Sequence, residues 1–146
     1  MKIHLAILYK DYLDLILEGK KTIEARFSKV KCPPYGKVSI GDKILLKETG
    51  GLIRGEAIVV DVKYYSNLTP ETIIKIINKY KDELMIKDDF LNSKIGSKYL
   101  TLIFLSKVKK YTQEIPFIKK DRRAWIVLSD EQQPTLFDFG KNRGCK

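Results

Sequence analysis

The order of the elements predicted from the sequence indicates an α+β fold, in which two helices accompany a small mixed or closed sheet. Strand-like segments outnumber helical ones, and the two kinds do not alternate along the chain as they would in a parallel α/β fold. The chain has 146 residues, 44% of them hydrophobic and 10% aromatic. A chain of this length and composition is expected to form one domain with a core of its own.

A buried strand and an amphipathic helix are expected first. Residues 3–8 (IHLAIL) are apolar apart from His4, which we expect to be packed in the core and not to act as a ligand. From Lys10 to Glu18 the apolar side chains recur at helical spacing, and Gly19 stands where a left-handed C-terminal cap is expected. A strand with period-2 patterning then starts near Lys21.

A rigid turn and a long hairpin are predicted next. The segment CPPYG (32–36) excludes a helix, because proline lacks the backbone donor that a helix requires. Residues 42–62 are typical of a hairpin that turns at Gly50 and Gly51. The hairpin supplies the third and fourth strands of the predicted sheet.

The second predicted helix has a clear start. Thr69 is expected to be its N-cap, with Pro70 in the first turn. Its apolar residues form one stripe, made of Ile73, Ile76, Ile77, Tyr80 and Leu84. The last two strands are expected over residues 99–108 and 124–128.

The net charge of the chain is +10 at pH 7, and such an excess attracts polyanions. Seven basic residues gather with only two acids in one segment: Lys107, Lys109, Lys110, Lys119, Lys120, Arg122 and Arg123. They are either a solvated loop or a surface that contacts phosphates. A membrane partner is not expected, because no basic amphipathic helix and no apolar run of about 20 residues is present.

Nothing in the sequence calls for a metal or another cofactor. The two cysteines, Cys32 and Cys145, lie far apart in the sequence. Their spacing favours a cytoplasmic protein over a disulfide framework or a metal site.

The segment EGKKTIEARF (18–27) places several charges where a half-buried strand is expected. Along a strand, Lys21 shares one face with apolar residues, and Glu24 and Arg26 share the other. Glu24 and Arg26 can therefore pair, whereas Lys21 heads an otherwise apolar row. The residues alone fit either a solvated strand face, which they favour slightly, or a polar site on a rigid element.

Gly19, Lys21, Glu24 and Arg26 fit the pattern G-x-K-x-x-E-x-R, which resembles the signature of the ASCH domain family in the PUA-like superfamily. The following GDKILL strand and hairpin, and the late KKDRRAWIVL segment, also resemble that family, so the resemblance covers residues 1–128. It implies a small PUA-like β-barrel flanked by helices. It also implies a cleft beside the signature strand that binds RNA, another single-stranded nucleic acid or a modified nucleoside.

In such a site, Lys21, Glu24 and Arg26 would hold a phosphate or the edge of a splayed base. Recognition of single-stranded RNA also needs a stacking ring, for which Tyr9, Tyr35 and Trp125 are candidates, although Trp125 is expected mainly in the core. The predicted phosphate contacts in this reading are Lys119, Lys120, Arg122 and Arg123.

A catalytic role for the same residues is the alternative. Lys21, with its pKa lowered by burial and by Arg26, can act as a general base while Glu24 relays the proton. Some bacterial members of the family that the chain resembles hydrolyse the amide of N4-acetylcytidine with the signature lysine, a threonine and a later glutamate. Here Glu24 stands at the position of that threonine, and Glu83 matches the later acid only loosely. Other relatives are ribonucleases, so an enzyme of this fold would be a metal-independent nucleoside amidohydrolase or a ribonuclease.

Residues 129–146 (SDEQQPTLFDFGKNRGCK) form a polar C-terminal tail with a few isolated large apolar side chains. The stretch QPTLFDF resembles the glutamine-x-x-leucine-aromatic peptides that bind DNA sliding clamps. This resemblance implies a third function, that of a clamp-associated adaptor, with partner-binding residues Gln133, Leu136, Phe137 and Phe139. The alternative is that the tail packs on its own domain.

Overall fold

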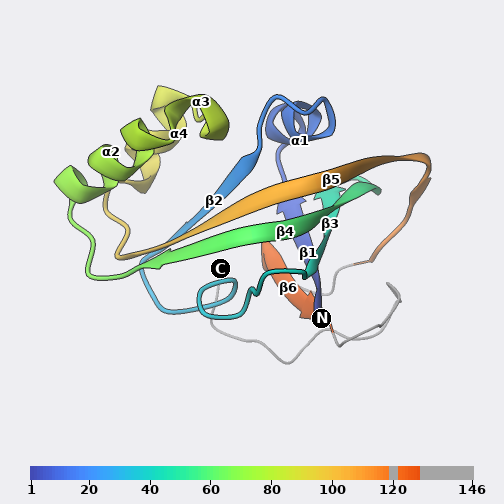
Figure 1. Cartoon of the computed structure of the whole chain (residues 1–146), viewed down its shortest axis with the longest axis horizontal. Helices are drawn as coiled ribbons and strands as arrows, with labels where there is room; N and C mark the ends of the chain where they lie inside the picture. Colours follow the sequence, from blue (N-terminus) through green and yellow to red (C-terminus); the bar gives the residue numbers. More distant parts are fainter. Residues whose placement is uncertain (119–121, 129–146) are drawn as a thin grey trace.

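The structure is a computed structural model that describes residues 1–118 and 122–128. Within these ranges the chain forms six strands and four helices, and all six strands belong to one sheet. The elements, coloured along the chain in Figure 1, are β1 (Ile3–Leu8), α1 (Lys10–Leu17), β2 (Ile23–Ser28), β3 (Lys43–Glu48), β4 (Ile53–Tyr65), α2 (Pro70–Lys79), α3 (Lys81–Leu84), α4 (Asp88–Lys94), β5 (Tyr99–Ile115) and β6 (Trp125–Leu128).

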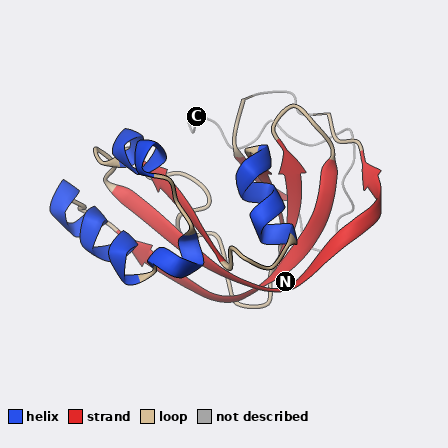
Figure 2. Ribbon diagram, turned by 90° about the horizontal axis from the view of Figure 1, so that it is seen from above, coloured by secondary structure: helices blue, strands red, loops and turns tan. Residues whose placement is uncertain are grey.

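The sheet is a mixed half-barrel with strand order β2-β5-β4-β3-β1-β6. Strand β1 pairs in parallel with β3, and the other pairs are antiparallel. Figure 2 shows that the sheet is strongly curved. The predicted α+β class with a mostly antiparallel sheet is confirmed. The two edges of the half-barrel are β2 and β6, which is important for the site.

Several local predictions are confirmed. Gly19 ends α1 with a φ of +78°, and Gly50 turns the β3–β4 hairpin with a φ of +70°. In this left-handed region glycine carries no steric penalty. Thr69 is the N-cap of α2, because its hydroxyl accepts a hydrogen bond from the Thr72 backbone nitrogen. These positions are set by chemistry within a few residues, so the sequence alone predicts them.

Other elements differ from the prediction. The single helix expected as far as Leu84 is interrupted at Tyr80, so that α3 is a separate turn, and α4 was not predicted. Strand β5 continues to Ile115, well past residue 108, because it pairs with β4 as far as Ile53. Lys107, Lys109 and Lys110 therefore lie on a strand and not in a loop.

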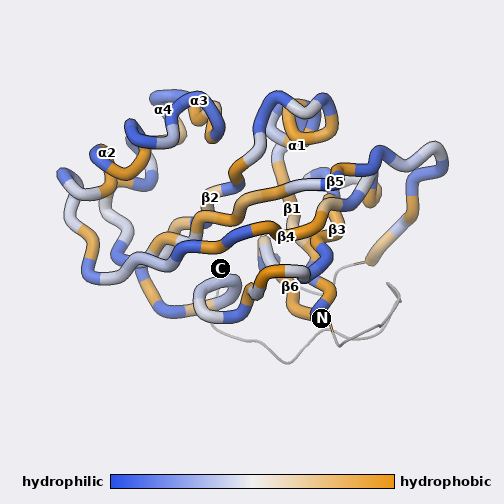
Figure 3. Tube along the Cα trace, viewed as in Figure 1, coloured by the Kyte–Doolittle hydropathy of each residue, from blue (hydrophilic) through white to orange (hydrophobic). Residues whose placement is uncertain are grey.

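Buried apolar side chains form separate clusters on the sheet. Helix α1 packs Leu13 and Ile16 over one part of the sheet, and α2 packs Ile73 and Ile77 over another. The hydropathy along the chain shows apolar residues concentrated in the strands (Figure 3). The opposite face of β1 and β6 holds a third cluster, which includes Leu5. Helices α1 and α2 thus pack against different parts of the sheet.

Two features bear on expectations from the composition. Cys32 is disulfide-bonded, which differs from the expectation of no disulfide; Cys145 is outside the described residues. In the part of the chain that the structure describes, no helix is long and apolar enough to cross a membrane.

Candidate functional site

A cavity of about 540 Å³ lies against the inner face of β2. Its walls also come from the start of α1, residues 32–35, α4 and the start of β6. A cavity of this size, with mostly apolar walls and a few polar groups, is typical of small-molecule sites. The predicted residues Lys21, Glu24 and Arg26 all line it. The segment EGKKTIEARF is therefore not a solvated strand face.

Lys21 lies buried at the inner end of the cavity, with a relative exposure of 2%. Its Nζ atom donates to the Leu84 carbonyl, lies 3.6 Å from Glu24 Oε1 and is 5.2 Å from the centre of the Tyr12 ring. Burial lowers the pKa of Lys21, and the Glu24 carboxylate partly offsets that shift. The ammonium group thus faces a carboxylate and an aromatic ring in a largely dehydrated site.

The contact between Lys21 and Glu24 corrects one prediction, because the sequence pattern placed them on opposite faces of a strand. Strand β2 begins only at Ile23. The chain between Gly19 and Thr22 is not extended sheet, so the alternation of faces does not apply to Lys21. The Thr22 backbone nitrogen donates to the Glu83 carbonyl, which holds this segment against α3.

Arg26 connects the two open edges of the half-barrel. Its Nε atom donates to Glu24 Oε2 at 2.8 Å, so the predicted pair is present. One terminal nitrogen donates to the Ile7 carbonyl at 2.8 Å, and the other to the Ala124 carbonyl at 3.1 Å. Since Arg26 lies on the edge strand β2, whereas Ile7 is in β1 and Ala124 directly precedes the opposite edge strand, the guanidinium spans the opening. It also fixes the Glu24 carboxylate from one side.

The three candidate stacking rings all line the cavity, in different environments. Tyr9 is 63% exposed, and Tyr35 is half-buried against Tyr64 and Tyr99. Trp125 is 3% exposed and its indole nitrogen donates to His4 Nδ1 at 3.1 Å. The expectation that Trp125 and His4 are packed in the core is confirmed.

Sequence reasoning missed several residues of the cavity. Phe27 and Phe90 add aromatic walls, Lys94 adds a cation, and the buried Thr101 of β5 lies opposite Arg26 in the strand register. Phe90 and Lys94 come from α4. The acidic pair Asp88–Asp89 in its first turn is a helix-start signal that could have identified this helix.

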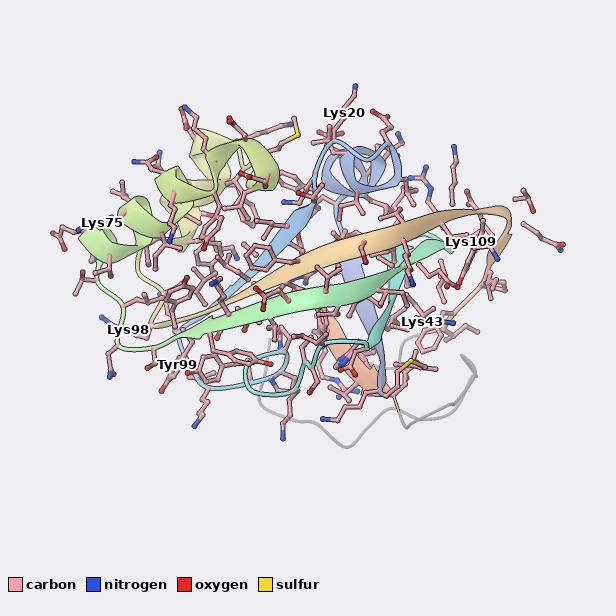
Figure 4. All side chains as sticks on the ribbon, in the orientation of Figure 1. Lys20, Lys43, Lys75, Lys98, Tyr99 and Lys109 are labelled. Atoms are coloured by element: carbon pink, nitrogen blue, oxygen red, sulfur yellow. The ribbon has the colours of Figure 1, made fainter. Side chains whose placement is uncertain are left out.

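The described residues of the predicted basic segment do not gather at the cavity. Arg122 lines the cavity, whereas Arg123 is buried and is not among the lining residues. Figure 4 shows Lys109 at the opposite end of β5 from Tyr99, and thus far from the end that adjoins the cavity. Lys119 and Lys120 lie outside the described residues, as do the predicted clamp-binding residues Gln133, Leu136, Phe137 and Phe139.

The weak catalytic candidate Glu83 does not join the site. It lies in α3 with an exposed side chain and is not among the residues that line the cavity. The carboxylate that faces Lys21 is that of Glu24, from the signature itself.

Comparisons with known proteins agree with this architecture. The ASCH domain model matches residues 7–129. The crystal structure of ASCH from Zymomonas mobilis has a TM-score of 0.69 at 15% identity, with 89% of this chain and 90% of that chain covered. A mutant of that protein gives a TM-score of 0.67 at 17% identity, with the same coverage of both chains. At these identities the structures show a shared fold. A search of curated proteins found no match.

Proposed function

Because the chain belongs to the ASCH domain family, we propose that its cavity binds a single nucleobase, presented either by a free modified nucleoside or by single-stranded RNA. The observation that supports this most is the Lys21–Glu24–Arg26 set, with Lys21 buried, in a cavity with aromatic walls. A nucleobase combines a flat π-face with an edge of donors and acceptors, so it needs both kinds of partner.

The polar groups suit the edge of a base. Glu24 accepts from ring or exocyclic N–H groups, and the Lys21 ammonium donates to a carbonyl oxygen or a ring nitrogen. Phe27 and Phe90 are suitable contacts for the faces of the ring. Since Arg26 already donates to three acceptors, its main role is to hold Glu24.

The same cavity offers a place for a phosphate. Lys94 and Arg122 line it, in addition to Lys21 and Arg26. In single-stranded RNA the phosphates flanking a displaced base would meet these two cations, whereas a free nucleoside would not use them. Substitution of Arg122 therefore distinguishes the two sources of the base.

Titration of the protein with cytidine, N4-acetylcytidine and a short single-stranded RNA tests the proposal. Trp125 is the single tryptophan of the chain and lines the cavity, so its fluorescence reports binding. Glu24→Gln is expected to weaken binding at least tenfold, because an unpaired buried donor costs about 1 to 3 kcal/mol. Arg122→Ala should weaken binding of the RNA alone. Equal affinity of Glu24→Gln and the unmodified protein for every probe would refute the proposal.

A second candidate is an amidohydrolase, favoured by the buried Lys21 with its lowered pKa beside Glu24. The neutral amine would take a proton from a water molecule that attacks the acetyl carbonyl of N4-acetylcytidine. The C–N bond then breaks and the proton passes to the leaving amine, which gives cytidine and acetate. If this holds, Lys21→Met lowers the rate by about 10² to 10⁴-fold. Chromatography that finds no cytidine with the unmodified protein removes this candidate.

A further inference from the structure

A buried hydrogen-bonded chain leads from the interior of the sheet to the cavity. His4, on β1, has no exposed surface, and its Nε2 atom lies 2.8 Å from Asp42 Oδ2. Its other nitrogen, Nδ1, lies 3.1 Å from the indole nitrogen of Trp125. Asp42 also accepts from the backbone nitrogens of Lys2 and Ser39, each at 3.0 Å. The carboxylate is thus fixed by three donors.

The direction of each hydrogen bond in this chain follows from chemistry. An indole N–H only donates, so His4 Nδ1 must be the acceptor and carry no proton. Neutral His4 therefore has its proton on Nε2, which donates to Asp42. Because both ring nitrogens are engaged, the His4 ring cannot flip without losing both partners, and the Trp125 N–H has a fixed acceptor.

Trp125 passes this orientation on to the cavity. The guanidinium carbon of Arg26 lies 5.3 Å from the centre of the Trp125 ring, in the geometry of a cation–π contact. The Nε atom of Arg26 donates to Glu24 Oε2, and the other oxygen of Glu24 faces Lys21. The contacts thus run without interruption from Asp42 to the carboxylate that lies beside Lys21 in the cavity.

We propose that Asp42 and His4 are positioning residues of this site: they fix the Trp125 indole, and through it the Arg26 guanidinium and the Glu24 carboxylate that the ligand meets. The role at the ligand rests on the function proposed above. The orientation of Trp125 and its coupling to Arg26 do not, because both are measurable in the free protein.

The decisive comparison is His4→Leu against His4→Gln. Leucine removes both hydrogen bonds, whereas the glutamine amide can accept from the indole with its oxygen and donate to Asp42 with its nitrogen. Since the chain has one tryptophan, the tryptophan band of its near-ultraviolet circular dichroism spectrum belongs to Trp125. The band is expected to change in His4→Leu and to recover in His4→Gln. Affinity for a nucleoside probe should fall about tenfold in His4→Leu and stay within about threefold in His4→Gln. The reason is that the polar contacts to the base are lost only in His4→Leu.

Leu5→Ala is the matched control for loss of stability alone. Leu5 is equally buried and adjoins His4 on β1, but packs in the cluster on the opposite face of the sheet. It should lower stability without changing the Trp125 band or the affinity. Asp42→Asn is a milder variant that replaces His4→Leu in this test if His4→Leu does not fold. It should change the Trp125 circular dichroism band in the same direction.

A double-mutant cycle completes the test in the absence of ligand. His4 and Arg26 are linked through Trp125, so their effects on the unfolding constant should couple by at least about threefold. An unchanged Trp125 band in His4→Leu and Asp42→Asn, or additive effects in the cycle, overturns the positioning role. Coupled effects in a protein that binds no nucleoside and no RNA would support the positioning role and refute the proposed function.

Discussion

Replacing Arg26 with alanine tests whether one side chain holds the open edges of the half-barrel together. Arg26 is 15% exposed and donates to Glu24 and Ile7 at 2.8 Å and to Ala124 at 3.1 Å. It also covers the Trp125 ring. These groups come from β2, β1, the residue before β6 and β6 itself, so the substitution removes the guanidinium contacts that cross the opening.

The expected loss of stability follows from the individual contacts. Hydrogen bonds from a charged donor contribute about 1.5 kcal/mol each at the lower end, so those to Glu24 and Ile7 give about 3 kcal/mol. The exposed bond to Ala124 adds less than about 1 kcal/mol, and the contact with Trp125 about 0.5 to 1 kcal/mol. Arg26→Ala should therefore lower the free energy of unfolding by about 3.5 to 5 kcal/mol, and the urea midpoint by about 2 M for a slope near 2 kcal/mol/M.

Arg54→Ala is the matched control. Arg54 is also 15% exposed, and it contacts three carboxylates, those of Asp14, Glu48 and Glu114, but does not line the cavity. Both variants should be less stable in urea titrations, and only Arg26→Ala should also shift the emission of Trp125 and weaken nucleoside binding. A change below about 1 kcal/mol for Arg26→Ala would show that the guanidinium does not hold the edges together.

The remaining predictions concern pH, salt and the tail. Burial lowers the pKa of Lys21, so as pH rises towards 10.5 the folded state loses this proton before the unfolded state does. The stability of the unmodified protein relative to Lys21→Met should therefore rise over that range, and parallel pH profiles would contradict it. Affinity for single-stranded RNA should fall as the salt concentration rises. If only Lys94 and Arg122 contact phosphates, the slope of log K against log salt should be near −1.4, at about −0.7 per phosphate. A slope near −3 would instead indicate that the Lys107–Arg123 segment also contacts phosphates. If the tail forms a clamp peptide, calorimetry with a sliding clamp should give micromolar binding. The Leu136→Ala, Phe139→Ala double variant should abolish it, since each buried apolar side chain contributes about 1.5 to 3 kcal/mol. Equal heats from both proteins would make the motif a coincidence.

The parts of the fold that were predictable depend on short-range chemistry. The cap at Gly19, the turn at Gly50 and the N-cap at Thr69 each need only a few neighbouring residues, and all three were found. The signature residues were identified as a site from the family resemblance, because charge patterning alone slightly favoured a solvated face. What placed Lys21 in the cavity was that β2 starts two residues later than the alternation suggested.

The parts that were missed depend on contacts between distant segments. Arg26 reaches the Ala124 carbonyl across 98 residues of sequence, and no pattern within β2 indicates that partner. The length of β5 is set by its pairing with β4, so Lys107, Lys109 and Lys110 lie on a strand and do not line the cavity. Likewise, the role of His4 depends on Asp42 and Trp125, which lie on other elements.

The burial of Lys21 is itself an argument that the cavity has a function. An ammonium group loses most of its hydration when it is buried. The Glu24 carboxylate, 3.6 Å from the Lys21 ammonium, compensates only in part, because burial remains the largest cause of the shift in the pKa of Lys21. A methionine at this position would pack against Tyr12 and Leu84 without that cost. A group that opposes folding, held in place by Glu24, Arg26 and a buried histidine–aspartate pair, is typical of sites in which stability is given up for binding or catalysis. The contacts around Lys21 are therefore better explained by a ligand than by the stability of the half-barrel.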